Sequence, residues 1–68
     1  MKKERLYDQL VDAIKKDEYS RMKDLMDGYT PAKLRVAYKV IEDIEGYEAA
    51  CAVRRGEYSR IGRWMGIV

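Results

Sequence analysis

The fold is decided by residues 31–55, PAKLRVAYKVIEDIEGYEAACAVRR, the longest stretch of the chain with helical periodicity. Thr30 and Pro31 form a strong helix start, because the hydroxyl caps free backbone amides and the proline φ is already helical. Gly56 supplies a stop. We therefore predict one helix over 31–55, about 37 Å long at 1.5 Å per residue. Gly46, in its middle, costs about 1 kcal/mol relative to alanine and marks a bend or a close helix contact.

The flanking segments predict three further helices, over 3–16, 18–27 and 57–65. Apolar residues recur there at spacings of three and four, as on one face of a helix. No stretch alternates with period two, so we expect an all-α fold: a small bundle of three helices plus a short C-terminal helix, in a single helical domain over 1–68. The predicted core consists of Leu6, Leu10, Ile14, Met22, Leu25, Met26, Leu34, Ala37, Ile41, Ile44 and Cys51.

Two short segments echo each other, EYSRM at 18–22 and EYSRI at 57–61. Both continue to a bulky apolar residue followed by methionine, at 25–26 and at 64–65. Duplication explains the echo, and so does convergence on a good amphipathic helix start. The sequence does not separate these two explanations.

Composition limits the chemistry that the 68 residues can perform. Lys and Arg number 14, Asp and Glu number 12, histidine is absent and there is a single cysteine. Ser-His-Asp and Cys-His sites are therefore excluded, as are an internal disulfide and a structural zinc site. We predict a non-enzymatic protein with no catalytic residue, no metal site and no cofactor. A small enzyme is a third hypothesis, which would depend on Cys51 or on Glu45 and Glu48, three apart on one helix face.

The chain is predicted to be cytoplasmic and to have no transmembrane segment. Its longest apolar run, 49–53, is far shorter than the roughly 20 residues that span a bilayer. Glu4, Asp8 and Asp12 interrupt the apolar region that a signal peptide needs. With hydrophobic residues at 47% and a net charge of only +2, the chain is expected to fold.

The predicted helix over 31–55 is charged against its dipole, with basic residues in its first half and acidic residues in its second. The segment after it is rich in arginine. Our hypothesis is a charge-registered antiparallel contact, either of the tail folded back on the acidic half or of two copies of the helix. A double change of Glu42 and Glu45 to lysine that altered neither stability nor oligomeric state would count against it.

Glu48 interrupts the apolar stripe of the same predicted helix, between Ile44 and Cys51. A carboxylate at such a position must either reach solvent or find a cationic partner. The sequence leaves open whether Glu48 is solvated or paired with Arg54, Arg55 or a basic residue of the C-terminal tail.

Binding is the function that the residue types favour. Tyr, Trp, Met and Arg are enriched at protein interfaces, and a tryptophan between arginines has the form of an interface anchor. We predict a small binding module that docks on a larger protein or self-associates. The segment 60–68, which contains this tryptophan, is also compatible with contact with a lipid surface or with a structural role in closing one end of a small core. The candidate contact residues are Tyr47, Tyr58, Arg60, Arg63 and Trp64.

Nucleic-acid binding is the leading alternative. The segments 18–27 and 31–55, joined by Gly28, have the layout of a helix-turn-helix. Asp24 stands where that motif prefers a small apolar residue, and a net charge of +2 is weak for binding phosphates. The contacts would come from Lys33, Arg35 and Lys39.

In size, charge density and helical texture the chain resembles the short helical proteins encoded by tailed bacteriophages and other mobile elements. The resemblance covers the whole chain and carries over no motif and no functional residue. It implies action by binding, as a virion accessory or as an inhibitor of host machinery. It also implies a location in the host cytoplasm or in the virion.

Overall fold

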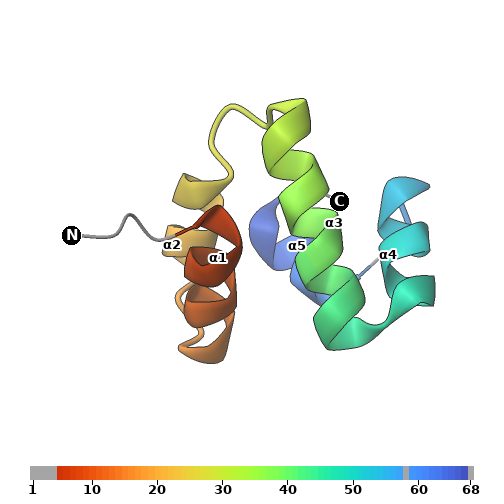
Figure 1. Ribbon diagram of the computed structural model, residues 1–68, viewed down its shortest axis with the longest axis horizontal. Coiled ribbons are helices and arrows are strands. Elements are labelled where there is room, and N and C mark those ends of the chain that lie inside the picture. The colour runs from red at the N-terminus through yellow and green to blue at the C-terminus, as the bar shows by residue number, and fades with distance from the viewer. Residues whose placement is uncertain (1–4, 58, 68) are drawn as a thin grey trace.

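The fold consists of two helix pairs and a final short helix that packs between them. The computed structural model describes residues 5–57 and 59–67, and within these ranges it contains no strand. The prediction of an all-α fold is therefore confirmed. In Figure 1, α1 and α2 lie at one end of the molecule and α4 at the other, with α3 and α5 between them. The helices are α1 (Leu6–Lys15), α2 (Tyr19–Leu25), α3 (Pro31–Glu45), α4 (Tyr47–Arg54) and α5 (Arg60–Met65).

α3 begins at Pro31, as the sequence predicts. Thr30 has extended backbone, and its side-chain oxygen accepts a hydrogen bond from the backbone N–H of Lys33 at 3.3 Å. Pro31 occupies the first helical turn, where its missing N–H leaves no helical hydrogen bond unmade. The cap and the proline together fix where the longest helix begins.

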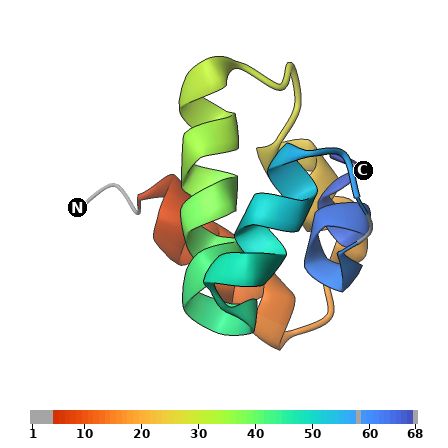
Figure 2. The ribbon, with the colours of Figure 1, turned by 90° about the vertical axis from the view of Figure 1, so that its right-hand side faces the viewer.

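The single predicted helix over 31–55 is wrong, because the chain breaks at Gly46 into α3 and α4. Gly46 has φ 106° and ψ 165°, a region of backbone space that is essentially restricted to glycine. After this residue α4 runs back beside α3 and packs against it, as Figures 1 and 2 show. The expected bundle of three helices plus one short helix therefore becomes five helices within the described residues.

The other predicted helix bounds, 3–16, 18–27 and 57–65, are all too long, and part of the first lies outside the described residues. The physical reason is clearest at α5. This helix begins only at Arg60, because Ser59 has extended backbone with φ −142° and ψ 137° and acts as its N-cap. The short helices thus extend only as far as their caps and packing support them.

The core lies where α1, α2, α3 and α5 meet, and α4 extends it on the far side of α3. Five of the predicted core residues are fully buried, and Leu6, Ile14, Leu25 and Leu34 pack against them with partial exposure. The confirmed buried residues are Leu10, Met22, Met26, Ala37 and Ile41. The core residues that the sequence did not predict are Ala13, Val40, Ala50, Val53, Ile61 and Met65.

Two predicted core residues lie elsewhere because of the break at Gly46. Ile44 is 44% exposed, since α3 ends one residue later and the chain turns away from the core. Cys51 is only half-buried, because α4 is oriented with Ala50 and Val53 toward α3. The apolar stripe of a straight helix is thus replaced by two shorter stripes in different registers.

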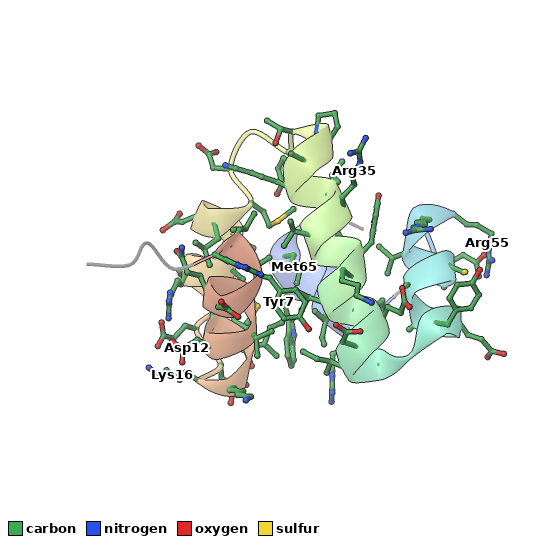
Figure 3. The ribbon with its side chains drawn as sticks, in the orientation of Figure 1. Tyr7, Asp12, Lys16, Arg35, Arg55 and Met65 are labelled. Carbon is green, nitrogen blue, oxygen red and sulfur yellow. The ribbon has the colours of Figure 1, made fainter. Side chains whose placement is uncertain are left out.

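α5 is held at both of its ends by residues far away in the sequence. At its start, Glu45 Oε1 accepts hydrogen bonds from Ser59 Oγ at 3.0 Å and from the backbone N–H of Ile61 at 3.1 Å. At its end, the Tyr29 hydroxyl donates to the Met65 carbonyl at 3.4 Å. The Met65 side chain points into the interior, as Figure 3 shows. These contacts fix α5 against the rest of the molecule.

Candidate functional site

α2 and α5 lie against each other because each helix turns a pair of apolar residues inward. The pair at α2 is Met22 and the C-cap residue Met26, and the pair on α5 is Ile61 and Met65, all at most 1% exposed. Four-residue spacing places both members of a pair on one helix face, so the outer faces of α2 and α5 are left to solvent. These four positions are also the ones that the EYSR echo aligns, although the origin of the echo stays open.

Tyr19 and Trp64 pack against each other at the seam between α2 and α5. Their ring centroids are 5.0 Å apart and the ring planes are inclined by 53°. A pair of this kind contributes about 0.5–1.5 kcal/mol beyond the area that it buries. Trp64 also packs against the core, whereas Tyr19 is 45% exposed. The Arg60 guanidinium carbon lies 5.2 Å from the centre of the Trp64 ring, so the aromatic seam already carries one cation.

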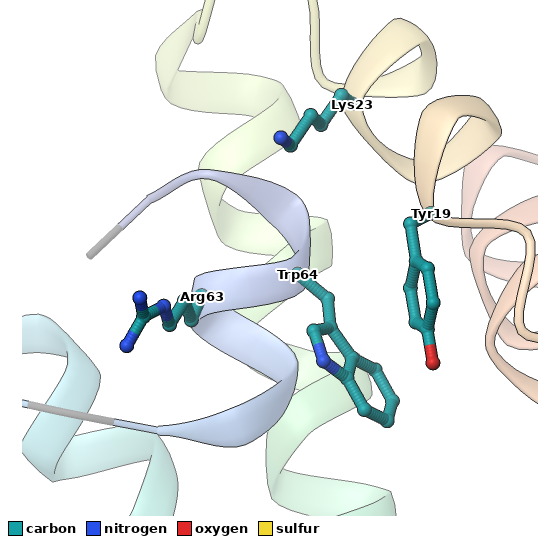
Figure 4. A pocket seen from close by; sticks show the side chains of 4 residues that line it. All are labelled: Tyr19, Lys23, Arg63 and Trp64. Carbon is teal, nitrogen blue, oxygen red and sulfur yellow. The ribbon is translucent and has the colours of Figure 1, made fainter.

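An open hollow of about 490 Å³ lies beside these rings, lined by Tyr19, Lys23, Arg63 and Trp64 (Figure 4). Lys23 and Arg63 are exposed, and neither has an acidic partner among the described residues. We call the surface formed by these four residues and Arg60 the α2–α5 face. Aromatic rings beside unpaired cations suit a partner that presents carboxylates next to apolar groups.

The five predicted protein-binding residues do not form one site. Arg60, Arg63 and Trp64 share the α2–α5 face, as their spacing on one short helix requires. Tyr58 lies outside the described residues. Tyr47 lies on α4, on a different part of the molecule.

Among the described residues, Tyr47 is the most exposed large hydrophobic side chain, at 68%. It lines a second, smaller hollow with Glu48, Cys51 and Arg55, the last of which Figure 3 shows at the C-terminal end of α4. A hydrogen bond with the Cys51 thiol raises the pKa of Tyr47 above its ordinary value. Glu48 is exposed, which answers the question that the sequence left open.

The α2–α5 face includes two residues that the sequence prediction missed, Tyr19 and Lys23. The echo is a signal for Tyr19, because it aligns Tyr19 with Tyr58 and the segment after it with the segment that contains Trp64, whereas Lys23 aligns with Gly62 and has no such signal. Had the two copies been assumed to pack on each other, Tyr19 would have entered the predicted site.

The pair of acids suggested for an enzyme does not share a helix face, because Gly46 separates Glu45 on α3 from Glu48 on α4. The Glu45 carboxylate is engaged with the start of α5. Cys51, expected to be buried, is half-buried. In the ranges 5–57 and 59–67, no group of three or more His, Cys, Asp or Glu side chains is placed to hold a metal ion.

The residues predicted to contact nucleic acid do not form a free basic stripe. Lys33 Nζ donates to the Asp27 carbonyl at 2.6 Å. Lys39 Nζ lies 3.4 Å from Asp43 and 4.0 Å from Glu42. Arg35, which Figure 3 shows near the start of α3, is exposed and has no such neighbour among the described residues. Two of the three cations are thus already engaged within the chain.

The acidic end of α3 is compensated in a way that differs from the predicted ion pairs with the tail. Tyr7 donates a hydrogen bond to Asp43, which lowers the pKa of Asp43 and raises the pKa of Tyr7. Within the described residues, Arg54 lies over the Tyr38 ring at 5.1 Å and Arg55 pairs with Glu57, so neither reaches the acids of α3. The Tyr7 phenol, the Lys39 ammonium, the Ser59 hydroxyl and the Ile61 amide take the place of the expected guanidinium groups.

Comparisons with protein-family models, with curated proteins and with solved structures find no match for this chain. No helix of the described residues is both long and apolar enough to cross a membrane.

Proposed function

We propose that this protein is a non-enzymatic binding module that docks on another protein chain through its α2–α5 face. The observation that supports the proposal is the combination of a packed aromatic pair, Tyr19 and Trp64, with cations that have no acidic partner in the described part of the chain. Tyr, Trp and Arg are the residue types that most often supply the binding energy of protein interfaces.

In this proposal the aromatic rings of the face supply most of the binding affinity, and its cations set the orientation of the partner. Tyr19 and Trp64 are held by their contact with each other, and Trp64 also by the core, so little side-chain entropy is lost when a partner covers them. Lys23 and Arg63, at the edge of the same hollow, would select a partner with acidic residues at its rim. A larger protein and a second copy of the chain both fit this description. The resemblance to phage-encoded helical proteins implies a virion accessory or an inhibitor of host machinery as the biological role.

Site-specific photo-cross-linking in the cells that make the protein tests this proposal. One variant carries p-benzoylphenylalanine in place of Arg63, and a control variant carries it in place of Arg35, which is also exposed but lies on α3. We expect a discrete adduct from position 63 and none from position 35, because only the first lies on the docking face. An adduct of twice 8.0 kDa would identify a second copy, and a different mass another protein. No adduct from position 63, or equal adducts from both positions, would contradict the proposal.

A further inference from the structure

The α2–α5 face carries positive charge on both of its helices. Lys23 on α2 and Arg63 on α5 line the hollow, and Arg60 lies beside it, over the Trp64 ring. All three cations are exposed, and within the described part of the chain no carboxylate pairs with any of them. Their charge is therefore available to a ligand rather than engaged in holding the fold together.

The hollow suits part of a macromolecule better than a small molecule. Its volume of about 490 Å³ is within the range of small-molecule sites, but it is open to solvent. Small-molecule sites bury most of the surface of their ligand, which an open hollow does not do. A side chain that projects from a larger partner would instead fill it against Tyr19 and Trp64, whose rings lie side by side in Figure 4.

Two observations favour carboxylates over phosphates as the anions that the face binds. A nucleic-acid base needs a free ring face to stack on, but the Arg60 guanidinium covers one face of Trp64, and Tyr19 packs against it too. Beyond the hollow, Asp24 and Asp27 follow Lys23 along the chain and are exposed. A nucleic-acid strand or an anionic bilayer extends its negative charge over a wide area and would meet these acids. A protein segment can present carboxylates at the hollow alone.

We infer that the α2–α5 face binds an acidic segment of another protein, in which carboxylates flank one apolar side chain. The apolar side chain contacts the rings of Tyr19 and Trp64, and the carboxylates pair with Lys23 on one helix and Arg63 on the other. Arginine can hold a carboxylate through two parallel N–H donors, whereas lysine acts as a point charge. This inference rests on the proposed function, and it states the chemistry of the partner.

Selection from a random peptide library tests the inference, with the purified chain as bait. The library holds peptides of about 12 residues without charge bias, and sequencing identifies the residues enriched among the binders. We expect Asp and Glu on both sides of an apolar residue. For the tightest such peptide, fluorescence anisotropy should show a dissociation constant that rises at least about tenfold in Lys23→Gln/Arg63→Gln, which removes both charges.

Charge reversal gives a second, independent readout. Lys23→Glu/Arg63→Glu should lose the acidic peptide and select peptides rich in Lys and Arg instead, because the sign of the face is inverted. Lys15→Glu/Arg35→Glu is the matched control, since it reverses the same two residue types at exposed positions on α1 and α3 and has the same net charge. The control should keep the wild-type affinity for the acidic peptide, and circular dichroism checks that each variant is folded.

The inference is supported if acidic peptides are selected, if both variants of the face lose them and if the control keeps them. It is overturned if no peptide is enriched, if the enriched peptides lack acidic residues, or if the control loses as much affinity as the variants of the face.

The other occupants of the face give results of their own. Tighter binding of oligothymidylate or of phosphatidylserine vesicles than of any selected peptide, lost in Lys23→Gln/Arg63→Gln, would overturn the inference and assign the face to phosphates. A mass of twice 8.0 kDa in light scattering, lost in the same variant, would overturn it in favour of a second copy. The cross-linking experiment stays independent, because an adduct from position 63 would retain the docking function even if the selected peptides were not acidic.

Discussion

Gly46 is the residue that most changes the shape of the molecule. Its φ of 106° and ψ of 165° let the chain leave α3 and return as α4 without an intervening loop. No atom lies within 4 Å of where a Cβ would be at this position. Any cost of a side chain here is therefore conformational rather than steric.

Replacing Gly46 by alanine should lower the free energy of unfolding by about 1–3 kcal/mol, because an L residue is strained in this region. D-alanine, introduced by chemical synthesis, has the mirror-image preference and should instead raise it by about 0.4–1 kcal/mol by restricting the unfolded chain. Urea unfolding of the two proteins and the wild type measures both effects. Equal destabilisation by the two enantiomers would show that space, and not backbone conformation, governs this position.

At the scale of elements, local signals predict where helices form but not where they turn. Thr30 and Pro31 start α3 as their chemistry requires, and the spacing of apolar residues identifies every helical segment. The sequence marks Gly46 as a weak point, yet its intrinsic cost of about 1 kcal/mol does not decide between a bend and a continuous helix. The decision comes from burying Ala50 and Val53 against α3, a tertiary contact that no local pattern contains.

Glu45 connects two elements, because the last residue of α3 accepts hydrogen bonds at the N-terminus of α5. It receives the Ser59 hydroxyl and the Ile61 amide, while Ser59, only 5% exposed, in turn accepts from the Gly62 amide at 3.3 Å. A negative charge at a helix N-terminus is favourable for the helix dipole. The short α5 thus has its cap supplied partly from another helix.

Glu45→Ala should destabilise the protein by about 1–3 kcal/mol, because the Ile61 amide loses its acceptor in a partly buried place. Glu48→Ala is the matched control: this glutamate is exposed on α4, and its loss should change stability by less than about 0.5 kcal/mol. Thermal unfolding followed by circular dichroism compares the two. Equal melting temperatures for both variants would mean that Glu45 does not hold α5.

At the scale of the whole molecule, a partly exposed charge cluster joins α1 to α2. Asp12 Oδ2 lies 2.7 Å from Arg21 and 3.2 Å from Lys16, and Figure 3 shows Asp12 and Lys16 together at the C-terminal end of α1. Arg21, and then Lys16, hold the pKa of Asp12 below its ordinary value of 3.8. A lowered pKa in the folded state means that the unfolded chain binds the proton more readily.

The contribution of Asp12 is therefore fully present above pH 3.8 and is lost as the pH falls through the lower, folded-state pKa. We expect Asp12→Asn to melt at a lower temperature than the wild type at neutral pH, with the difference vanishing in strong acid. Asp27→Asn, whose side chain is exposed, is the control and should follow the wild type throughout. A constant difference between Asp12→Asn and the wild type at every pH would contradict the ionic origin of the effect.

Only part of the α2–α5 face can be predicted from the sequence, because the rest depends on how two helices from distant parts of the chain pack together. Arg60, Arg63 and Trp64 are recognisable because interface-type residues lie close together on one short segment. Tyr19 and Lys23 become part of the face only when α2 and α5 dock, and that contact joins distant parts of the chain. Tyr47 is a tyrosine like Tyr19 and is more exposed, but it lies on α4 and is not part of the α2–α5 face.

The central claim is that the α2–α5 face is where the chain meets its partner. Photo-cross-linking in the cells that make the protein tests it most directly, with p-benzoylphenylalanine placed in turn at Lys23, at Arg63 and at the exposed Tyr47 of α4. The account predicts adducts of the same mass from positions 23 and 63 and none from position 47. No adduct from either position of the face, or adducts mainly from position 47, would contradict it.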